Sequence, residues 1–241
     1  MEFSVIFAVV CAYIIKGMCG FGNTLVFSTI LSFTTNNINI SPVDLIIGYP
    51  PNIYISWKER HSIKIGSCIP LIIMIITGSV AGVFFLKNGD TGLIKILFGF
   101  TIIFIGIENL IRERQKVKKK NSRLVLLLIG ILSGVLCGLY GIGAFLAAYM
   151  NRTTENQSQF RGNICLVFLV ENTFRIFLYS VTGILNVAIL QKAVLLLPFM
   201  VLGLVIGLAL SKSSSEKLIK KAVIILLILS GVSLVINNII P

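Results

Sequence analysis

The chain has 241 residues, of which 56% are hydrophobic and 12% charged, and its net charge is +12. Apolar runs long enough to cross a bilayer recur along the whole sequence, so the composition predicts an all-α integral membrane protein. The positive charge does not indicate nucleic-acid binding, because the basic residues lie in short loops between apolar runs and not along one soluble face. We therefore expect a multi-pass protein of the cell membrane, of the kind found in a prokaryotic plasma membrane.

Neither a cleaved leader nor a bound metal is predicted. No charged region precedes Phe3 and the apolar runs continue to Ile240, so we expect no signal peptide. The five cysteines are an odd number without a C-x-x-C pair, and the single histidine, His61, stands in a basic loop. These observations argue against a disulfide framework, a zinc site and a histidine-dependent active site, so we expect no cofactor and no enzymatic activity.

Eight apolar segments follow one another along the chain. They cover residues 3–33, 42–57, 66–87, 92–111, 124–150, 163–182, 190–211 and 218–240. The longest polar break, RERQKVKKKNSR, covers residues 112–123 and separates a first half, 1–111, from a second half, 124–241. We expect this basic linker to lie in the cytoplasm and to contact acidic lipids.

The two halves carry the same features in the same order, which indicates an internal duplication. A G-x-x-G-x-G motif recurs at an offset of 121 residues, an asparagine at 120 and a pair of glycines at 125. The matching positions are Gly17 and Gly138, Gly20 and Gly141, Gly22 and Gly143, Asn52 and Asn172, Gly78 and Gly203, and Gly82 and Gly207. We interpret the halves as homologous, because so many matches in one order are not expected by chance.

The first segment of each half, 3–33 or 124–150, is too long for one straight span and too short for two, since about 20 helical residues cross the membrane core. Its glycines can either kink a long helix or turn the chain back as a re-entrant hairpin. Apart from Lys16 and Arg175, the lysines and arginines divide 16 to 3 between the two sides with hairpins, and 11 to 8 if all eight segments span. The positive-inside rule therefore favours hairpins.

Each half then holds one glycine-broken re-entrant hairpin and three transmembrane helices, an odd number of crossings, so the second half enters the membrane inverted. The basic loops would be cytoplasmic and both termini outside. The alternative is eight spanning helices, four in each half. Inverted repeats with broken helices are an architecture of secondary transporters, which bind their substrate near the bilayer midplane.

The paired glycine motifs are candidates for that binding site. Glycine lets the backbone turn and approach a ligand closely, and half-helices beginning near Asn23 and Ala144 would point N–H groups at an anion. The alternative role of small residues is close helix packing, which we expect for the pairs spaced by four, Gly78/Gly82 and Gly203/Gly207.

Two cations, Lys16 and Arg175, lie inside apolar segments, where charges are costly and are candidates for function. Glu171 lies one helical turn before Arg175, so the two either form an internal ion pair, or Arg175 binds an oxyanion while Glu171 couples transport to protons. Asn52 and Asn172 could donate to the same oxyanion or to backbone freed at a kink, and the sequence GYPPN before residue 53 predicts a break in the second segment. The predicted substrate-binding residues are Lys16, Gly17, Gly20, Gly22, Asn23, Asn52, Gly138, Gly141, Gly143, Asn172 and Arg175.

These motifs resemble the sulfite exporter TauE/SafE family, also called the toluene sulfonate uptake permease family. The resemblance covers nearly the whole chain and rests on GMCGFGNTLVFSTIL, GILSGVLCGLYGIGAFLAAYM and FRGN at 160–163. Two motifs depart from it: Ala144 and Phe145 stand where a glycine and a proline are common, and the usual arginine, alanine, threonine run reads Arg161, Gly162, Asn163.

The resemblance implies a secondary carrier that moves small anions, such as sulfur oxyanions or organosulfonates, by alternating access around a mid-membrane site. A membrane scaffold and an anion channel are the alternatives. The expected partners are a small anion, the lipid bilayer and a proton as coupling ion, and the sequence does not predict the oligomeric state.

Overall fold

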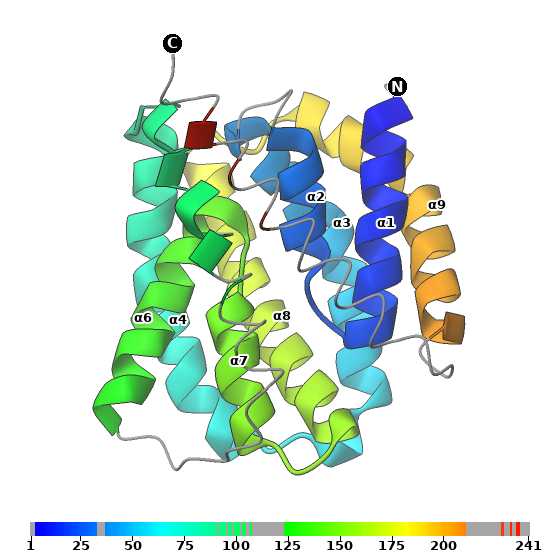
Figure 1. Ribbon diagram of the computed structural model, residues 1–241, viewed down its shortest axis with the longest axis vertical. Helices are drawn as coiled ribbons and strands as arrows, with labels where there is room; N and C mark the ends of the chain where they lie inside the picture. The colour runs from blue at the N-terminus through cyan, green and yellow to red at the C-terminus, as the bar shows by residue number, and fades with distance from the viewer. Residues whose placement is uncertain are drawn as a thin grey trace.

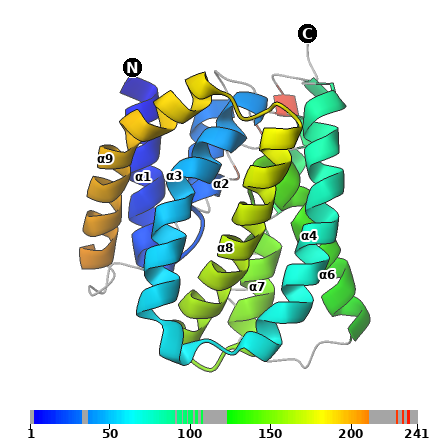
Figure 2. The same cartoon turned by 180° about the vertical axis from the view of Figure 1, so that it is seen from behind.

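The computed structural model describes residues 3–32, 37–90, 92–94, 96–97, 99–101, 103–104, 107, 123–210, 228, 232 and 235–236. Within these ranges all regular elements are helices, which run roughly along one axis (Figures 1 and 2). The first half contains α1 (Phe3–Cys19), α2 (Asn23–Ser32), α3 (Asn37–Lys58), a 3-10 turn (Arg60–Ser62) and α4 (Ile65–Asn88). The second half contains α6 (Arg123–Tyr140), α7 (Ala144–Thr153), α8 (Gln157–Val181) and α9 (Val187–Leu210).

Several sequence predictions fall on other residues. The linker at 112–123 lies outside the described residues except for Arg123, and so does most of the segment at 218–240. The boundaries between the halves and the contact of the linker with acidic lipids therefore stay predictions.

Among the described residues, three helices are long and apolar enough to cross a membrane, namely Ile65–Asn88, Ser158–Val181 and Val187–Leu210. Their outer surfaces carry large apolar side chains such as Phe84 and Val201, which are more than half exposed. Apolar groups on this scale face outward where the surrounding solvent is lipid and not water. The all-helical membrane class predicted from composition is confirmed.

Both over-long segments break where the glycine motifs predict. Residues 3–32 form α1 and α2, which pack on each other and are separated by residues 20–22, so the chain reverses its direction (Figure 1). Residues 124–150 form α6 and α7, separated by residues 141–143. Each segment is thus a pair of shorter helices.

The predicted break at GYPPN is wrong, because α3 continues through Pro50 and Pro51 to Lys58. A proline removes one backbone hydrogen bond four residues back and bends a helix, and packing on both sides can hold such a helix together. α8 also begins six residues earlier than its apolar segment. Asn156 caps it by accepting a hydrogen bond from the Gln159 backbone N–H at 2.8 Å, so its polar first turns are helical.

The glycines spaced by four make two close helix crossings, as predicted. On the α4 side, a Cβ at Gly82 would lie 2.9 Å from Gly138 Cα of α6. On the α9 side, a Cβ at Gly203 would lie 2.6 Å from the Val10 carbonyl oxygen of α1. The first helix of each half therefore packs against the long helix of the other half, because small residues let the backbones approach.

α3 packs against α8, and the loops that precede α4 and α8 meet at one end of the molecule. Lys64 Nζ lies 2.6 Å from Glu155 Oε1, and the Lys64 backbone N–H donates to Asn163 Oδ1 at 2.9 Å. Residues from the two halves are thus joined at this end.

Candidate functional site

The two glycine turns have the backbone geometry that only glycine adopts readily. Gly20, Gly22 and Gly141 have φ angles of +84°, +90° and +76°. The backbone N–H of Gly20 donates to the Lys16 carbonyl at 2.7 Å, and that of Gly141 donates to the Cys137 carbonyl at 2.8 Å. Gly143 has a negative φ, and its role is space, since a Cβ there would collide with the Phe168 ring.

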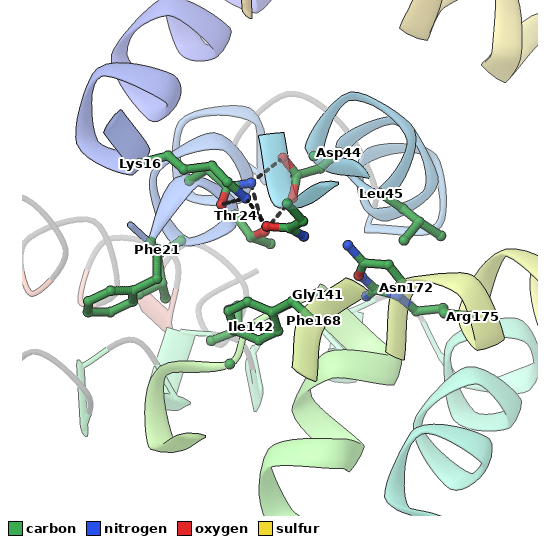
Figure 3. A pocket seen from close by; sticks show the side chains of 16 residues that line it. Lys16, Phe21, Thr24, Asp44, Leu45, Gly141, Ile142, Phe168, Asn172 and Arg175 are labelled. Carbon is green, nitrogen blue, oxygen red and sulfur yellow. Dashed lines mark hydrogen bonds between the residues drawn. The ribbon is translucent and has the colours of Figure 1, made fainter. Parts of the chain in front are cut away.

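A pocket lies between the two turns and is lined by residues from both halves (Figure 3). Its lining residues are Lys16, Phe21, Gly22, Asn23, Thr24, Leu25, Asp44, Leu45, Gly48, Asn52, Gly141, Ile142, Gly143, Phe168, Asn172 and Arg175. The helices α2 and α7 begin at its edge, and the first N–H groups of a helix have no partner within that helix. Charged groups and helix ends therefore converge on one space.

The first half supplies an amine, Lys16, whose side chain is 2% exposed. Lys16 Nζ donates to Asn52 Oδ1 at 2.8 Å and to Asn23 Oδ1 at 3.2 Å. These two amides replace part of the hydration that a buried ammonium group loses. Asn52 therefore binds the Lys16 ammonium group. This role differs from both predicted roles, which were donation to an oxyanion and donation to backbone freed at a kink.

The first half also supplies a carboxylate, Asp44 of α3, whose side chain is 3% exposed. Thr24 Oγ1 donates to Asp44 Oδ2, and Asn23 Nδ2 donates to Asp44 Oδ1 at 3.2 Å. Asn23 thus stands between the carboxylate and the amine, accepting from Lys16 and donating to Asp44. The two charges share a pocket without a direct ion pair among the described contacts.

The second half supplies Arg175 of α8, which lies at the second glycine turn. Its Nη1 donates to the Cys137 carbonyl and its Nη2 donates to Asn172 Oδ1 at 3.0 Å. A Cβ at Gly141 would lie 3.1 Å from Nη1, so the guanidinium lies directly against the turn. The C-terminal end of α6 carries partial negative charge, which a cation stabilises.

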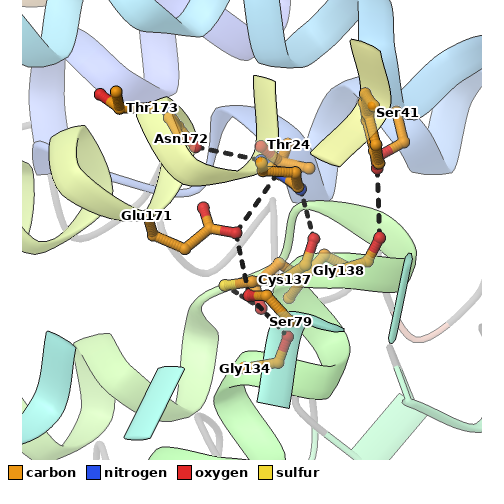
Figure 4. A network of polar contacts seen from close by, with 12 residues as sticks. Thr24, Ser41, Ser79, Gly134, Cys137, Gly138, Glu171, Asn172 and Thr173 are labelled. Carbon is orange, nitrogen blue, oxygen red and sulfur yellow. Dashed lines mark hydrogen bonds and ion pairs between the residues drawn. The ribbon is translucent and has the colours of Figure 1, made fainter. Parts of the chain in front are cut away.

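Glu171 is not among the residues that line the pocket and lies beside Ser79 in the polar network of Figure 4. Its Oε1 is 3.4 Å from Arg175 Nε and accepts from Ser79 Oγ at 3.1 Å, and the residue is 1% exposed. The same network continues to Tyr179, whose hydroxyl donates to the Gly138 carbonyl at 3.1 Å. The internal ion pair considered for Glu171 and Arg175 is therefore present, and Arg175 also faces the pocket.

The predicted site residues occupy three different places. Those that line the pocket are Lys16, Gly22, Asn23, Asn52, Gly141, Gly143, Asn172 and Arg175. Gly17 and Gly138 lie at the helix crossings, where a Cβ would lie 2.8 Å from Gly207 C and 2.9 Å from Gly82 Cα. Gly20 lies against the Arg161 side chain, whose Nη2 donates to the Met18 carbonyl at 2.5 Å.

Sequence reasoning missed Asp44, Thr24 and the contact of Arg161. Asp44 follows Ser41 and Pro42 at the start of an apolar segment, where an acidic residue reads as part of a loop. Because α3 begins at Asn37, the carboxylate lies two turns inside the helix. An acidic residue in the first two turns of an apolar segment is the sequence signal that could have identified Asp44.

These features define the class of the protein: a helical membrane protein with a buried, cation-lined pocket between two glycine turns. A family model described as sulfite exporter TauE/SafE matches residues 5–234. The chain belongs to this family and is a membrane transporter of the class that exports sulfur-containing anions. Searches of curated proteins and of solved structures returned no significant match.

Proposed function

We propose that the chain is a secondary transporter of small sulfur oxyanions or organosulfonates, which bind between Lys16 and Arg175 and cross by alternating access. The observation that carries the proposal is the pocket itself. It is lined by one buried cation from each half, and both glycine turns border it. Two of the three ionisable side chains in the lining are cations, and buried cations are candidates for binding an anionic ligand.

Arg175 has donors left for such a ligand. Its Nη1 and Nη2 each carry two hydrogens and each make one hydrogen bond to the protein. The remaining two N–H groups can bind two oxygens of a sulfonate or sulfite side by side. Lys16 provides a third donor from the opposite side of the pocket, and the first N–H groups of α2 and α7 can contribute more.

We further propose that the halves form an inverted repeat with two re-entrant hairpins. Reciprocal packing supports this arrangement, since α1 packs on α9 and α6 packs on α4, and these are the equivalent pairs in the two halves. The ion pair of Lys64 with Glu155 also supports it. If all eight segments spanned, the loops that contain these residues would lie on opposite sides of the membrane.

Single-cysteine labelling tests the topology after the native cysteines are replaced. Cysteines at Ser62 and Ser158 should label only from the cytoplasm, and one at Asn186 only from outside, in keeping with the basic residues near 58–64 and 152–161. Eight spanning helices predict instead that positions 62 and 186 label from the same side and position 158 from the other.

Ligand binding tests the function. Thermal shift in detergent across sulfite, thiosulfate, sulfonates and carboxylates should reveal stabilisation by sulfur oxyanions, because a ligand of the folded state raises its stability with occupancy. The binders should then accumulate in proteoliposomes against their gradient, which a channel cannot do. No stabilisation by any of these anions, with intact protein, would indicate a scaffold.

A further inference from the structure

Asp44 is the one ionisable side chain of the pocket that the anion site does not use. The lining residues with ionisable side chains are Lys16, Asp44 and Arg175. Lys16 and Arg175 attract an anion, whereas a charged Asp44 repels it, and all three side chains are buried. The presence in the pocket of a carboxylate that repels the ligand therefore suggests a separate function for it.

The balance of charge around the pocket indicates what the function of Asp44 is. Lys16 and Arg175 carry two positive charges, and Asp44 and Glu171 carry two negative ones when both are ionised. The buried region is then neutral without a ligand, and a bound monoanion leaves it with an uncompensated negative charge, which is costly away from water. A proton taken up together with the anion restores neutrality.

The geometry points to Asp44, and not Glu171, as the group that takes up the proton. We propose that Asp44 is a proton-binding site whose protonation is coupled to anion binding between Lys16 and Arg175. The inference rests on the function proposed above and deepens it, since it makes transport of the anion proton-coupled through one named residue.

Contacts distinguish the two carboxylates. Glu171 Oε1 lies 3.4 Å from Arg175 Nε, behind the guanidinium and outside the pocket lining, so its charge is already matched. Asp44 lines the pocket, and its partners are the neutral donors Thr24 and Asn23. Protonation of Asp44 therefore breaks no direct ion pair.

Three helices, α1, α2 and α8, bring polar or charged groups toward Asp44. α1 contributes Lys16, through Asn23, and the Tyr13 hydroxyl, which Asn23 Nδ2 also approaches at 3.5 Å. α2 contributes Thr24, and α8 contributes the charge of Arg175 across the pocket. When an anion neutralises Lys16 and Arg175, the field that favours an ionised Asp44 weakens, so anion and proton binding support each other.

Calorimetric titration of the full chain in detergent tests the inference, with methanesulfonate, toluenesulfonate and thiosulfate as probes. Heats measured in two buffers of different ionisation enthalpy give the number of protons taken up. For a bound sulfonate, wild type should take up close to one proton per anion, and its affinity should fall about tenfold per pH unit on the alkaline side. Asp44→Asn should take up none and bind with pH-independent affinity.

Glu155→Gln is the matched control, because it makes the same exchange of carboxylate for amide on an exposed loop residue and should keep the proton uptake of wild type. If Asp44→Asn does not fold, Thr24→Val removes the donor to Asp44 Oδ2 and should shift the pH at which affinity falls to a higher value.

The inference is overturned if wild type binds a sulfonate without taking up a proton, or if Asp44→Asn takes up as many as wild type. It is equally overturned if the uptake disappears in Glu171→Gln and persists in Asp44→Asn, or if binding follows the sodium concentration and not pH. If none of the three probes binds at any pH, the proposed function fails, and not the proton coupling.

Discussion

The two halves contribute the same kinds of charge to the pocket region but arrange them differently. Each supplies one cation and one carboxylate, Lys16 with Asp44 and Arg175 with Glu171. In the second half the pair lies in direct contact at 3.4 Å and only the arginine lines the pocket. In the first half Asn23 separates the charges and both line the pocket.

The predicted duplication does not account for this difference. At the offsets of 121 and 120 residues, Cys137 stands where the first half has Lys16, and Ile55 stands where the second half has Arg175. The asparagines at matching positions, in contrast, have the same role. The side-chain oxygen of Asn52 accepts from Lys16, and that of Asn172 accepts from Arg175. The two glycine turns thus share positive φ angles at Gly20 and Gly141, while the charges beside them stand at different positions in the two halves.

The largest expected effect comes from breaking the direct ion pair of Arg175 with Glu171. Arg175→Gln should abolish transport and also lower the free energy of unfolding by about 3 to 5 kcal/mol, because it leaves Glu171 buried and unpaired. Adding Glu171→Gln should restore the stability but not the transport. Melting temperature and proteoliposome uptake measure the two effects, and recovered uptake in the double variant would remove Arg175 from the binding site.

Lys16→Gln should also abolish transport but destabilise the fold much less than Arg175→Gln. Asp44 keeps the hydrogen bonds from Thr24 and Asn23 when the amine is gone, so no carboxylate loses a direct partner. The same melting and uptake measurements apply. Equal destabilisation by the two substitutions would mean that Lys16 and Asp44 are as tightly paired as Arg175 and Glu171.

The glycines at the helix crossings should affect stability and not ligand preference. Gly17→Ala and Gly138→Ala each insert a methyl group against the backbone of α9 or α4, which should cost about 1 to 3 kcal/mol. Gly66→Ala is the matched control, because a Cβ there meets nothing within 4 Å. The ranking of sulfite against sulfonates should be unchanged in all three variants, and an altered ranking would return Gly17 and Gly138 to the binding site.

The smallest expected effect concerns the hydrogen bond from Ser79 to Glu171, the ion-pair partner of Arg175. Ser79→Ala removes one hydrogen bond from Glu171 and should lower stability by about 1 kcal/mol, with a minor loss of anion affinity. Thr77→Ala is the control on the same helix, since its hydroxyl is exposed and bonds only to carbonyls of its own α4. A larger loss of affinity than of stability in Ser79→Ala would show that Glu171 tunes the arginine.

The sequence was sufficient for the turns and for the two buried cations. The length of residues 3–33 and 124–150 is incompatible with single spans, and charge inside an apolar run stands out from its neighbours, so both signals are local. The roles of the individual glycines cannot be predicted from such local signals. Gly17 and Gly22 differ by five positions, yet one meets α9 and the other lines the pocket, which depends on packing between the halves.

Long-range contacts explain the other misses. The Arg161 side chain reaches the Met18 carbonyl across 143 positions of sequence, and no local pattern marks that contact. GYPPN predicts a break because two prolines weaken an isolated helix, whereas α3 packs against α8, α9 and α2. The polar residues at the start of α3 give no local sign that Asp44 is buried.

The position of a bound anion tests the central claim most directly. Selenite, a heavier analogue of sulfite, should give an anomalous scattering peak in the pocket, between Lys16 Nζ and the Arg175 guanidinium, in crystals of the full chain. The peak should be lost in Arg175→Gln/Glu171→Gln crystals, in which the fold is retained. A peak confined to the exposed basic residues near Lys58 and Lys64, with the pocket free of selenium, would contradict an anion site shared by the two halves.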